Sequence, residues 1–202
     1  MVANATKFAF EGEFAERAQK AMSKYPHERR QSAVLALLDL AQRQDGRVLP
    51  SGAIQTVAEM LGMPEIRVME VATFFTMINL KPVGKFHLQM CGTTPCMLCG
   101  ADEVLEAAEK HLGIRRGETS ADGSFTISVV ECLGACCNAP MVQINDDYYE
   151  DLTPESFVGI LDKLKAGETV KPGSQTGRRT SEPQGGLTSL TTLTFDQPGG
   201  DD

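Results

Sequence analysis

The sequence predicts a mixed α and β protein: a helical bundle, then a smaller α/β module that holds every cysteine, then a disordered tail. Residues 11–80 carry apolar side chains at the spacings of three and four that are typical of helices. Residues 81–168 alternate strand-like apolar runs with helical segments. Residues 169–202 are dominated by Gly, Pro, Ser and Thr without periodicity, which is typical of a flexible segment.

Four helices are predicted in the first part, over about residues 11–24, 28–44, 51–61 and 64–75. Tyr25-Pro26 ends the first helix, because proline disfavours a helical residue before it, and Gly62 ends the third. In the fourth helix the expected buried stripe is Ile66, Met69, Val71, Phe74 and Phe75. We find no catalytic constellation in this part of the chain.

The second part has the element order of a small α/β layer of the thioredoxin type. Strands are predicted over 85–90 and 125–130, and helices over about 101–112 and 154–166. Between the second strand and the last helix, residues 141–149 predict a hairpin, because Asn145 and its two Asp neighbours favour a tight turn. Thr153 is expected to cap the last helix.

All six cysteines lie in two short segments, each of which follows a predicted strand. The first cysteine segment, residues 91–99, has the pattern Cys91-x4-Cys96-x2-Cys99, and the second cysteine segment, residues 132–140, has Cys132-x3-Cys136-Cys137. Thiolates are soft ligands that suit an iron–sulfur cluster or zinc. A [2Fe–2S] cluster needs two ligands per iron, and the spacing favours Cys91 with Cys96 and Cys132 with Cys136.

The charge of such a cluster makes demands on its surroundings. Two ferric ions, two sulfides and four thiolates sum to about −2, and reduction makes the sum about −3. The site must therefore supply amide N–H donors. Gly92 and Gly134 let the backbone approach the sulfurs, and the helix that starts near Ala101 directs its N-terminus at the first segment.

Three alternatives remain open from the residues alone. The spacing of Cys91, Cys96 and Cys99 also fits the plant-type ferredoxin pattern, with a fourth ligand from the second segment. A thioredoxin-like dithiol enzyme would use Cys96 and Cys99, which leaves the other cysteines unexplained. A zinc-stapled binding module would accept four of these thiols, but the usual x2 spacing occurs once.

Composition excludes several classes of function. The formal charge of −8 argues against binding to nucleic acid or to an anionic membrane surface. No apolar run approaches the length that spans a membrane, so direct membrane insertion is not expected. The start has neither a basic n-region nor an apolar h-region, so we expect a reducing, cytosol-like compartment, in which clustered cysteines are more often metal ligands than disulfides.

At these positions the chain resembles a known family, the small [2Fe–2S] E subunits of NADH:quinone oxidoreductase, respiratory complex I. The resemblance covers about residues 14–166 and rests on Val71-Ala-Thr-Phe-Phe-Thr-Met77, Leu80-Lys-Pro-Val-Gly-Lys85, Cys91-x-x-Thr-Pro-Cys96, Glu131-Cys-Leu-Gly-Ala-Cys136 and the run from Asn138 to Tyr149. It implies a thioredoxin-like ferredoxin domain behind a helical bundle, with the cluster held by Cys91, Cys96, Cys132 and Cys136.

The resemblance also implies partners. The chain is expected to dock on the FMN- and NADH-binding subunit within the peripheral arm of a bacterial inner-membrane complex, on its cytoplasmic side. The chain itself has no dinucleotide-binding Gly-rich fingerprint, so it is expected to transfer electrons and not to oxidise NADH alone. Related subunits serve NAD-linked formate dehydrogenases and hydrogenases. Cys99 and Cys137 depart from the family pattern, and the tail lies outside it.

Overall fold

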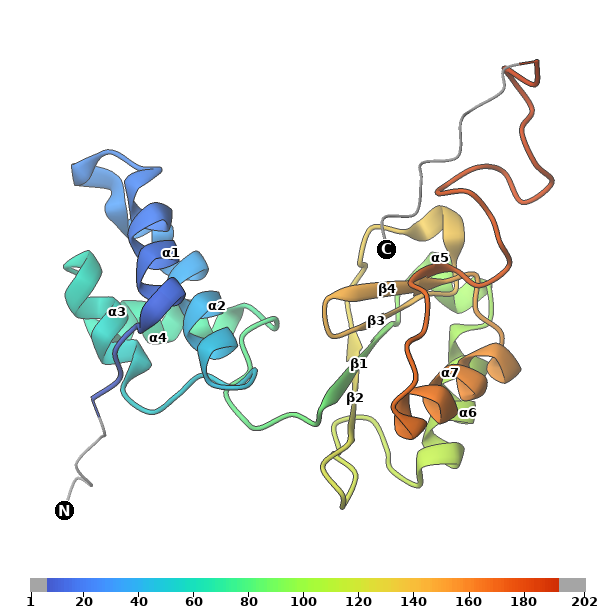
Figure 1. The fold of residues 1–202 in the computed structure, drawn as a ribbon, viewed down its shortest axis with the longest axis horizontal. Helices are drawn as coiled ribbons and strands as arrows, with labels where there is room; N and C mark the ends of the chain where they lie inside the picture. The colour runs from blue at the N-terminus through green and yellow to red at the C-terminus, as the bar shows by residue number, and fades with distance from the viewer. Residues whose placement is uncertain (1–6, 193–202) are drawn as a thin grey trace. The chain divides into compact units, whose positions relative to one another are not determined.

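The computed structural model describes residues 7–192, which form two compact units that meet in the sequence between Val83 and Gly84 (Figure 1). The last ten residues of the predicted tail, 193–202, lie outside the described residues. Within 7–192 no helix has both the length and the apolar character needed to cross a membrane.

The first unit is helical, as the sequence predicts. It contains α1 (Gly12–Ser23), η1 (His27–Ala33), α2 (Val34–Gln44), α3 (Ala53–Leu61) and α4 (Glu65–Phe74). The helix expected over 28–44 begins as the 3-10 helix η1 and becomes an α-helix only at Val34. Small and aliphatic side chains fill the core of this unit; they include Ala18, Leu37, Leu38, Val57 and Val68.

The buried stripe predicted for α4 is wrong at four of its five positions, and only Val71 packs, partly buried, against the core. The fully buried residues of this helix are Val68 and Ala72. Ile66, Met69 and Phe74 are exposed instead, Phe74 to 77% of its area. The short helix is weakly amphipathic, so the packing of small side chains against α2 and α3 decides which face is buried. Its larger apolar side chains are left on the surface of the unit.

The second unit is built on a mixed sheet with the strand order β2-β1-β3-β4-β5. Strands β1 (Phe86–Cys91) and β2 (Phe125–Val130) are parallel, with Leu88 opposite Ile127. Strand β3 (Val142–Ile144) runs antiparallel to β1 and forms a hairpin with β4 (Asp147–Glu150). Asn145 lies in this turn with a φ of 58°, a left-handed conformation that asparagine tolerates. The hairpin is the one predicted.

Two long helices, α6 (Ala101–Leu112) and α7 (Pro154–Ala166), pack together beside the sheet (Figure 1). Thr153 caps α7 through a reciprocal capping box with Ser156, and a 2.8 Å contact between His111 Nε2 and an Asp162 carboxylate oxygen joins the two helices. Their apolar faces share one core with the sheet, which includes Leu88, Val104, Phe125, Ile127, Phe157 and Leu161. The predicted α/β layer is confirmed.

Three short elements of this unit were not predicted. The first cysteine segment contains helix α5 (Thr94–Leu98), and the second contains the 3-10 helix η2 (Cys136–Asn138). Strand β5 (Gly173–Ser174) lies in the segment predicted to be a flexible tail and pairs with β4 in parallel. Each has at most five residues, which is too short for a periodic pattern to show.

The largest fully buried side chain of α7 gives a direct test of this core. Phe157 is 0% exposed, so Phe157→Ala removes its contacts with the sheet and leaves a cavity. We expect the free energy of unfolding of the metal-free chain, measured in urea, to fall by about 3–5 kcal/mol. Leu98→Ala, at an exposed position, is the control and should change it by less than about 0.5 kcal/mol. Equal effects of the two substitutions would contradict this packing.

Candidate metal centre

The first cysteine segment places two sulfurs in the interior. Cys91 is the last residue of β1, and Cys96 lies within α5; their residues are only 2% and 1% exposed. Thr93 is extended and Pro95 stands in the first turn of α5, where a missing N–H costs nothing. The sheet and the short helix therefore fix the inner pair of thiols from both sides.

The second cysteine segment places two sulfurs at the surface. Cys132 follows β2, Cys136 begins η2, both are exposed, and their Sγ atoms lie 3.4 Å apart. Gly134 bends the chain between them with a φ of 87°, a conformation that side-chain-bearing residues rarely adopt. The Tyr148 hydroxyl donates a 2.9 Å hydrogen bond to the carbonyl of Leu133 and ties the segment to the hairpin.

The thiols of the inner pair shift each other's pKa in opposite directions. Burial raises the pKa of Cys96 to about 12, and its hydrogen bond with Cys91 adds to the rise. Burial alone would also raise the pKa of Cys91. Hydrogen bonds from the hydroxyl and amide of Thr93 and from the amide of Leu133 outweigh it, so the net pKa is lowered. Cys91 therefore loses its proton more readily than Cys96 does.

The outer pair behaves in the same way. A hydrogen bond from the Gly134 amide, 3.4 Å from the sulfur, lowers the pKa of Cys132, and its contact with Cys136 lowers it further. The pKa of Cys136 is raised, chiefly by that same contact with Cys132 and then by partial desolvation of its sulfur. In the metal-free chain Cys132 therefore loses its proton more readily than Cys136 does.

Charges also connect the two pairs. The charge of Cys136 raises the pKa of Cys96, and the charge of Cys91 raises the pKa of both Cys132 and Cys136. The four cysteines predicted from the sequence are thus brought together as two pairs, one from each segment. Within residues 7–192 no group of three or more His, Cys, Asp or Glu side chains is arranged so that it could hold one metal ion. A binuclear cluster differs from a single ion, because each of its two irons needs only two thiolates from the protein.

The amide donors expected for an anionic cluster are present. Backbone N–H groups of Thr93, Leu133, Gly134 and Met141 point at the sulfurs. Gly92 has no room for a side chain, because a Cβ there would lie 2.7 Å from Cγ1 of Val129. Of these donors, sequence reasoning indicated only Gly134 and missed Thr93, Leu133 and Met141, because which amides face a sulfur depends on how the two segments meet.

The remaining cysteines have other places in the fold. Cys99 is exposed and follows the last residue of α5, where its N–H closes the helix. Cys137 is exposed in η2, and its carbonyl oxygen accepts a 2.7 Å hydrogen bond from Arg178. His87, predicted to be a strand residue, is buried on β1 with Nε2 2.8 Å from the Ser128 hydroxyl.

A groove of about 930 Å³ lies beside the second cysteine segment. One wall carries Gly134 and Cys137, and the other carries residues 171–181 of the C-terminal segment. The surroundings of the outer cysteines therefore include a part of the chain in which the sequence shows no site.

Known proteins resemble this chain in sequence and in fold. Residues 18–165 match the family model described as thioredoxin-like [2Fe–2S] ferredoxin. The chain is 56% identical over 160 residues to a Rickettsia conorii protein named as the E subunit of NADH-quinone oxidoreductase, with 79% of this chain and 96% of that protein covered.

A Dictyostelium discoideum protein named mitochondrial NADH dehydrogenase [ubiquinone] flavoprotein 2 is 47% identical over 186 residues, with 92% of this chain and 75% of that protein covered. Among solved structures, an NAD⁺-reducing [NiFe]-hydrogenase in the H₂-reduced state aligns with a TM-score of 0.56 at 17% identity. The alignment covers 65% of this chain and 23% of that chain, and it shows a shared fold only.

The opposite pKa shifts of the outer pair predict selective alkylation of the metal-free chain. A lowered pKa means that the Cys132 thiolate forms at lower pH, whereas the raised pKa of Cys136 delays its thiolate to higher pH. In an iodoacetamide pH series read by peptide mass spectrometry, Cys132 should reach half-maximal labelling at lower pH than Cys136. The reverse order would contradict a hydrogen bond donated from Cys136 to Cys132.

Proposed function

This chain belongs to the thioredoxin-like [2Fe–2S] ferredoxin family, and we propose that it is the electron-transferring E subunit of an NADH:quinone oxidoreductase. In this role it carries one [2Fe–2S] cluster and exchanges single electrons with FMN on the NADH-binding subunit. The relatives named for that enzyme support the assignment at 56% and 47% identity over most of the chain.

The cluster ligands that we propose are Cys91, Cys96, Cys132 and Cys136. This choice rests on the arrangement of these thiols as two hydrogen-bonded pairs. The pairs lie close enough that the charge of one shifts the pKa values of the other. Each pair supplies the two thiolates that one iron of a binuclear cluster needs. The donor set fits the group chemically, because soft thiolates are surrounded by amide donors and small side chains.

When bound, a [2Fe–2S] cluster supplies reversible one-electron redox chemistry and becomes more negative on reduction. Polar groups of the chain can stabilise that negative charge through hydrogen bonds to the sulfurs. The Thr93 hydroxyl lies 3.4 Å from the sulfur of Cys91, and the Gly134 amide donates to Cys132. Hydrogen bonds to sulfur favour the anionic form and therefore tune the reduction potential upward.

The difference in burial between the two pairs indicates where electrons enter and leave. Cys91 and Cys96 are shielded from water, whereas Cys132 and Cys136 lie at the surface. Within the first cysteine segment, α5 exposes Met97 and Leu98, the latter to 78% of its area. Exposed apolar side chains of this size mark contact surfaces, so we propose that the flavin-bearing subunit covers this end of the unit.

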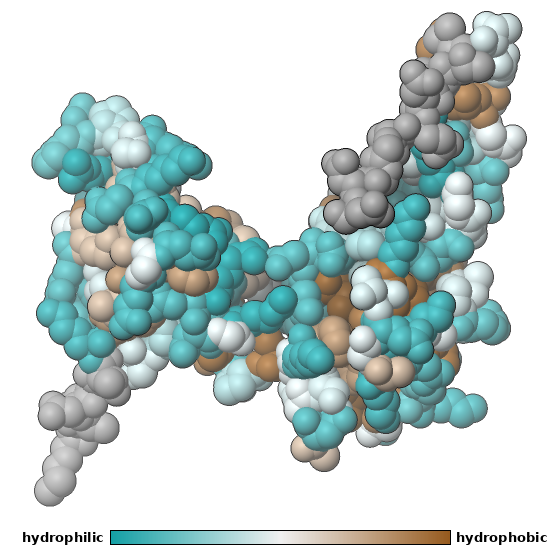
Figure 2. Space-filling view, viewed as in Figure 1, coloured by the Kyte–Doolittle hydropathy of each residue, from teal (hydrophilic) through white to brown (hydrophobic). Residues whose placement is uncertain are grey.

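The first unit supplies a further apolar surface for assembly. Ile66, Met69 and Phe74 of α4 are exposed, and Figure 2 shows apolar areas among mostly hydrophilic side chains on both units. We propose that α4 contacts other subunits of the peripheral arm, on the cytoplasmic side of a bacterial inner membrane.

The other candidate functions receive less support. The likeness to the hydrogenase is in fold alone, so the named relatives favour the quinone-linked enzyme over a hydrogenase or formate dehydrogenase. Family membership favours iron–sulfur over the zinc module and the dithiol enzyme. The dithiol enzyme would moreover rely on Cys96, whose pKa is raised, the opposite of what an attacking thiol needs.

Substitution of single cysteines tests the function and the ligand set together. Anaerobically purified wild-type chain should contain two irons and two sulfides and show a spin-half EPR signal only after reduction. Cys91→Ser, Cys96→Ser, Cys132→Ser and Cys136→Ser should each lose or strongly alter that signal. Cys99→Ala and Cys137→Ala are the matched controls and should retain it. Zinc without iron in the wild type would overturn the assignment, and loss of the signal in Cys99→Ala would favour the plant-type set.

A charge at the exposed end of α5 tests the proposed docking surface. Leu98→Asp should weaken binding to the flavin-bearing subunit by about tenfold or more, because an apolar anchor becomes a buried charge in the interface. Binding is measured by titration of the purified partner. Leu98→Met keeps the surface apolar and should bind as the wild type does, and both variants should keep iron and sulfide. Wild-type affinity of Leu98→Asp would place the interface elsewhere.

A further inference from the structure

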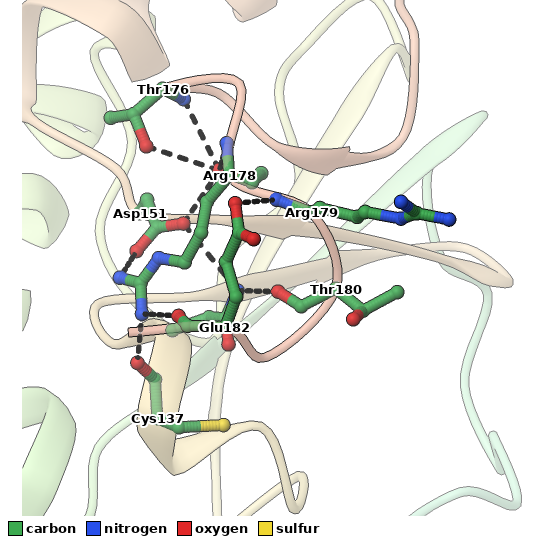
Figure 3. A network of polar contacts seen from close by, with 9 residues as sticks. Cys137, Asp151, Thr176, Arg178, Arg179, Thr180 and Glu182 are labelled. Carbon is green, nitrogen blue, oxygen red and sulfur yellow. Dashed lines mark hydrogen bonds and ion pairs between the residues drawn. The ribbon is translucent and has the colours of Figure 1, made fainter. Parts of the chain in front are cut away.

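Residues 172–182, which we call the C-terminal strap, lie beyond residue 165, where the family match ends, yet they are tied to the second cysteine segment. Strand β5 opens the strap beside β4, and the chain then returns towards η2 (Figure 3). Arg178 and Thr180 of the strap bond to Cys137 and Asn138. The strap is therefore attached directly after the proposed ligand Cys136.

The centre of this contact is the carboxylate of Asp151. Asp151 follows β4, is buried, and has a φ of 55°. One carboxylate oxygen pairs with the Arg178 guanidinium, and the other accepts a 2.6 Å hydrogen bond from the Ser174 hydroxyl. The Asp151 N–H donates to the carbonyl of Asn138 at 2.8 Å. A buried carboxylate requires such partners, and the strap provides the cation and the hydroxyl.

Arg178 joins the two sides of the contact through one planar group. Its Nη2 pairs with Asp151, while its Nη1 donates to the carbonyl of Cys137 at 2.7 Å and to that of Glu182 at 3.2 Å. Figure 3 shows the guanidinium between Asp151 and Cys137. A guanidinium presents several donors in a fixed plane, which an ammonium group does not.

Asn138 completes the connection to the ligand. Its N–H donates to the carbonyl of Ala135 at 3.0 Å and so closes the turn that contains Cys136. Its buried side-chain amide donates to the carbonyl of Thr180 at 2.7 Å and to Asp151 at 3.4 Å. Hydrogen bonds therefore hold the chain on both sides of Cys136. Before it, Ala135 bonds to Asn138, and after it, Cys137 and Asn138 bond to Arg178 and Thr180 of the strap.

We propose that Arg178 is a positioning residue for the [2Fe–2S] cluster. Its guanidinium holds η2 against Asp151, and this contact keeps Cys136 in place at the exposed end of the site. The proposal rests on the proposed function, in which Cys136 is a ligand. The strap then acts as a clamp on the more exposed half of the ligand set, which includes Cys136. The positive charge of Arg178 also favours the reduced state of the cluster, which is the more negative one.

The test uses the full-length, cluster-loaded chain with three variants. Arg178→Ala removes the clamp and the charge. Arg178→Lys keeps the charge but loses the planar set of donors. Arg179→Ala is the matched control, because it removes the same charge one residue along; the Arg179 side chain points away from Asp151 in Figure 3. For each variant we would measure the rate of cluster loss to an iron chelator, the midpoint potential and the EPR spectrum of the reduced cluster. Thermal unfolding followed by far-UV CD would show whether the variant is folded.

Arg178→Ala should lose the cluster about tenfold faster than the wild type, since charge-assisted hydrogen bonds to Asp151 and Cys137 are gone. Its midpoint potential should be more negative and its EPR spectrum altered. Arg178→Lys should also lose the cluster faster, with a potential close to that of the wild type. Arg179→Ala should match the wild type in the rate of cluster loss, the midpoint potential, the EPR spectrum and the CD melt.

Wild-type cluster loss, potential and spectrum in Arg178→Ala would overturn the proposal. If that variant is recovered unfolded, Arg178→Lys decides in its place: faster cluster loss with an unchanged melt supports the clamp, and wild-type retention overturns it. A wild-type chain without iron and sulfide would instead count against the proposed function, so the two failures are distinguishable.

Discussion

The second unit must hold four cysteine thiols close together at a partly buried site. It must also stabilise the negative charge that these thiols carry when they are deprotonated. Thiolates near one another raise the free energy of the charged state, and burial raises it further, as the pKa of about 12 at Cys96 shows. Amide and hydroxyl groups donate hydrogen bonds to the sulfurs of Cys91 and Cys132 and so offset part of this free energy. Two parallel strands, β1 and β2, end side by side and bring both cysteine segments to the same edge.

The two segments meet this constraint by different means. The first is held by packing, because Cys91 and Cys96 share a small buried cluster with Ala101 and Met141. The second lies at the surface and is held by polar contacts, from Tyr148 on one side and from the Arg178 and Asp151 pair on the other. A redox centre needs one side open to its partner, and hydrogen bonds can fix an exposed segment where apolar burial is not available.

The first unit has no side-chain constellation of its own among its described residues, and its surface indicates a role in assembly. Val68 and Ala72 face the core of that unit, so the larger side chains of α4 remain outside. Exposed apolar residues of that kind cost solubility unless a partner covers them. This arrangement agrees with the Rickettsia relative, whose name is that of one subunit of a larger enzyme.

The sequence by itself determined the order of the long elements, the hairpin, the cap at Thr153 and the pairing of cysteines by segment, because all of these depend on local spacing and local turn chemistry. The buried face of α4 was decided by tertiary structure, since a ten-residue helix with apolar residues on several sides has no single preferred face. Tertiary structure also decided which amides face the sulfurs and that Arg178 reaches Asp151, 27 positions earlier. A run of Gly, Ser and Thr around two arginines has no period to detect, and only the buried carboxylate that it meets gives it a fixed place.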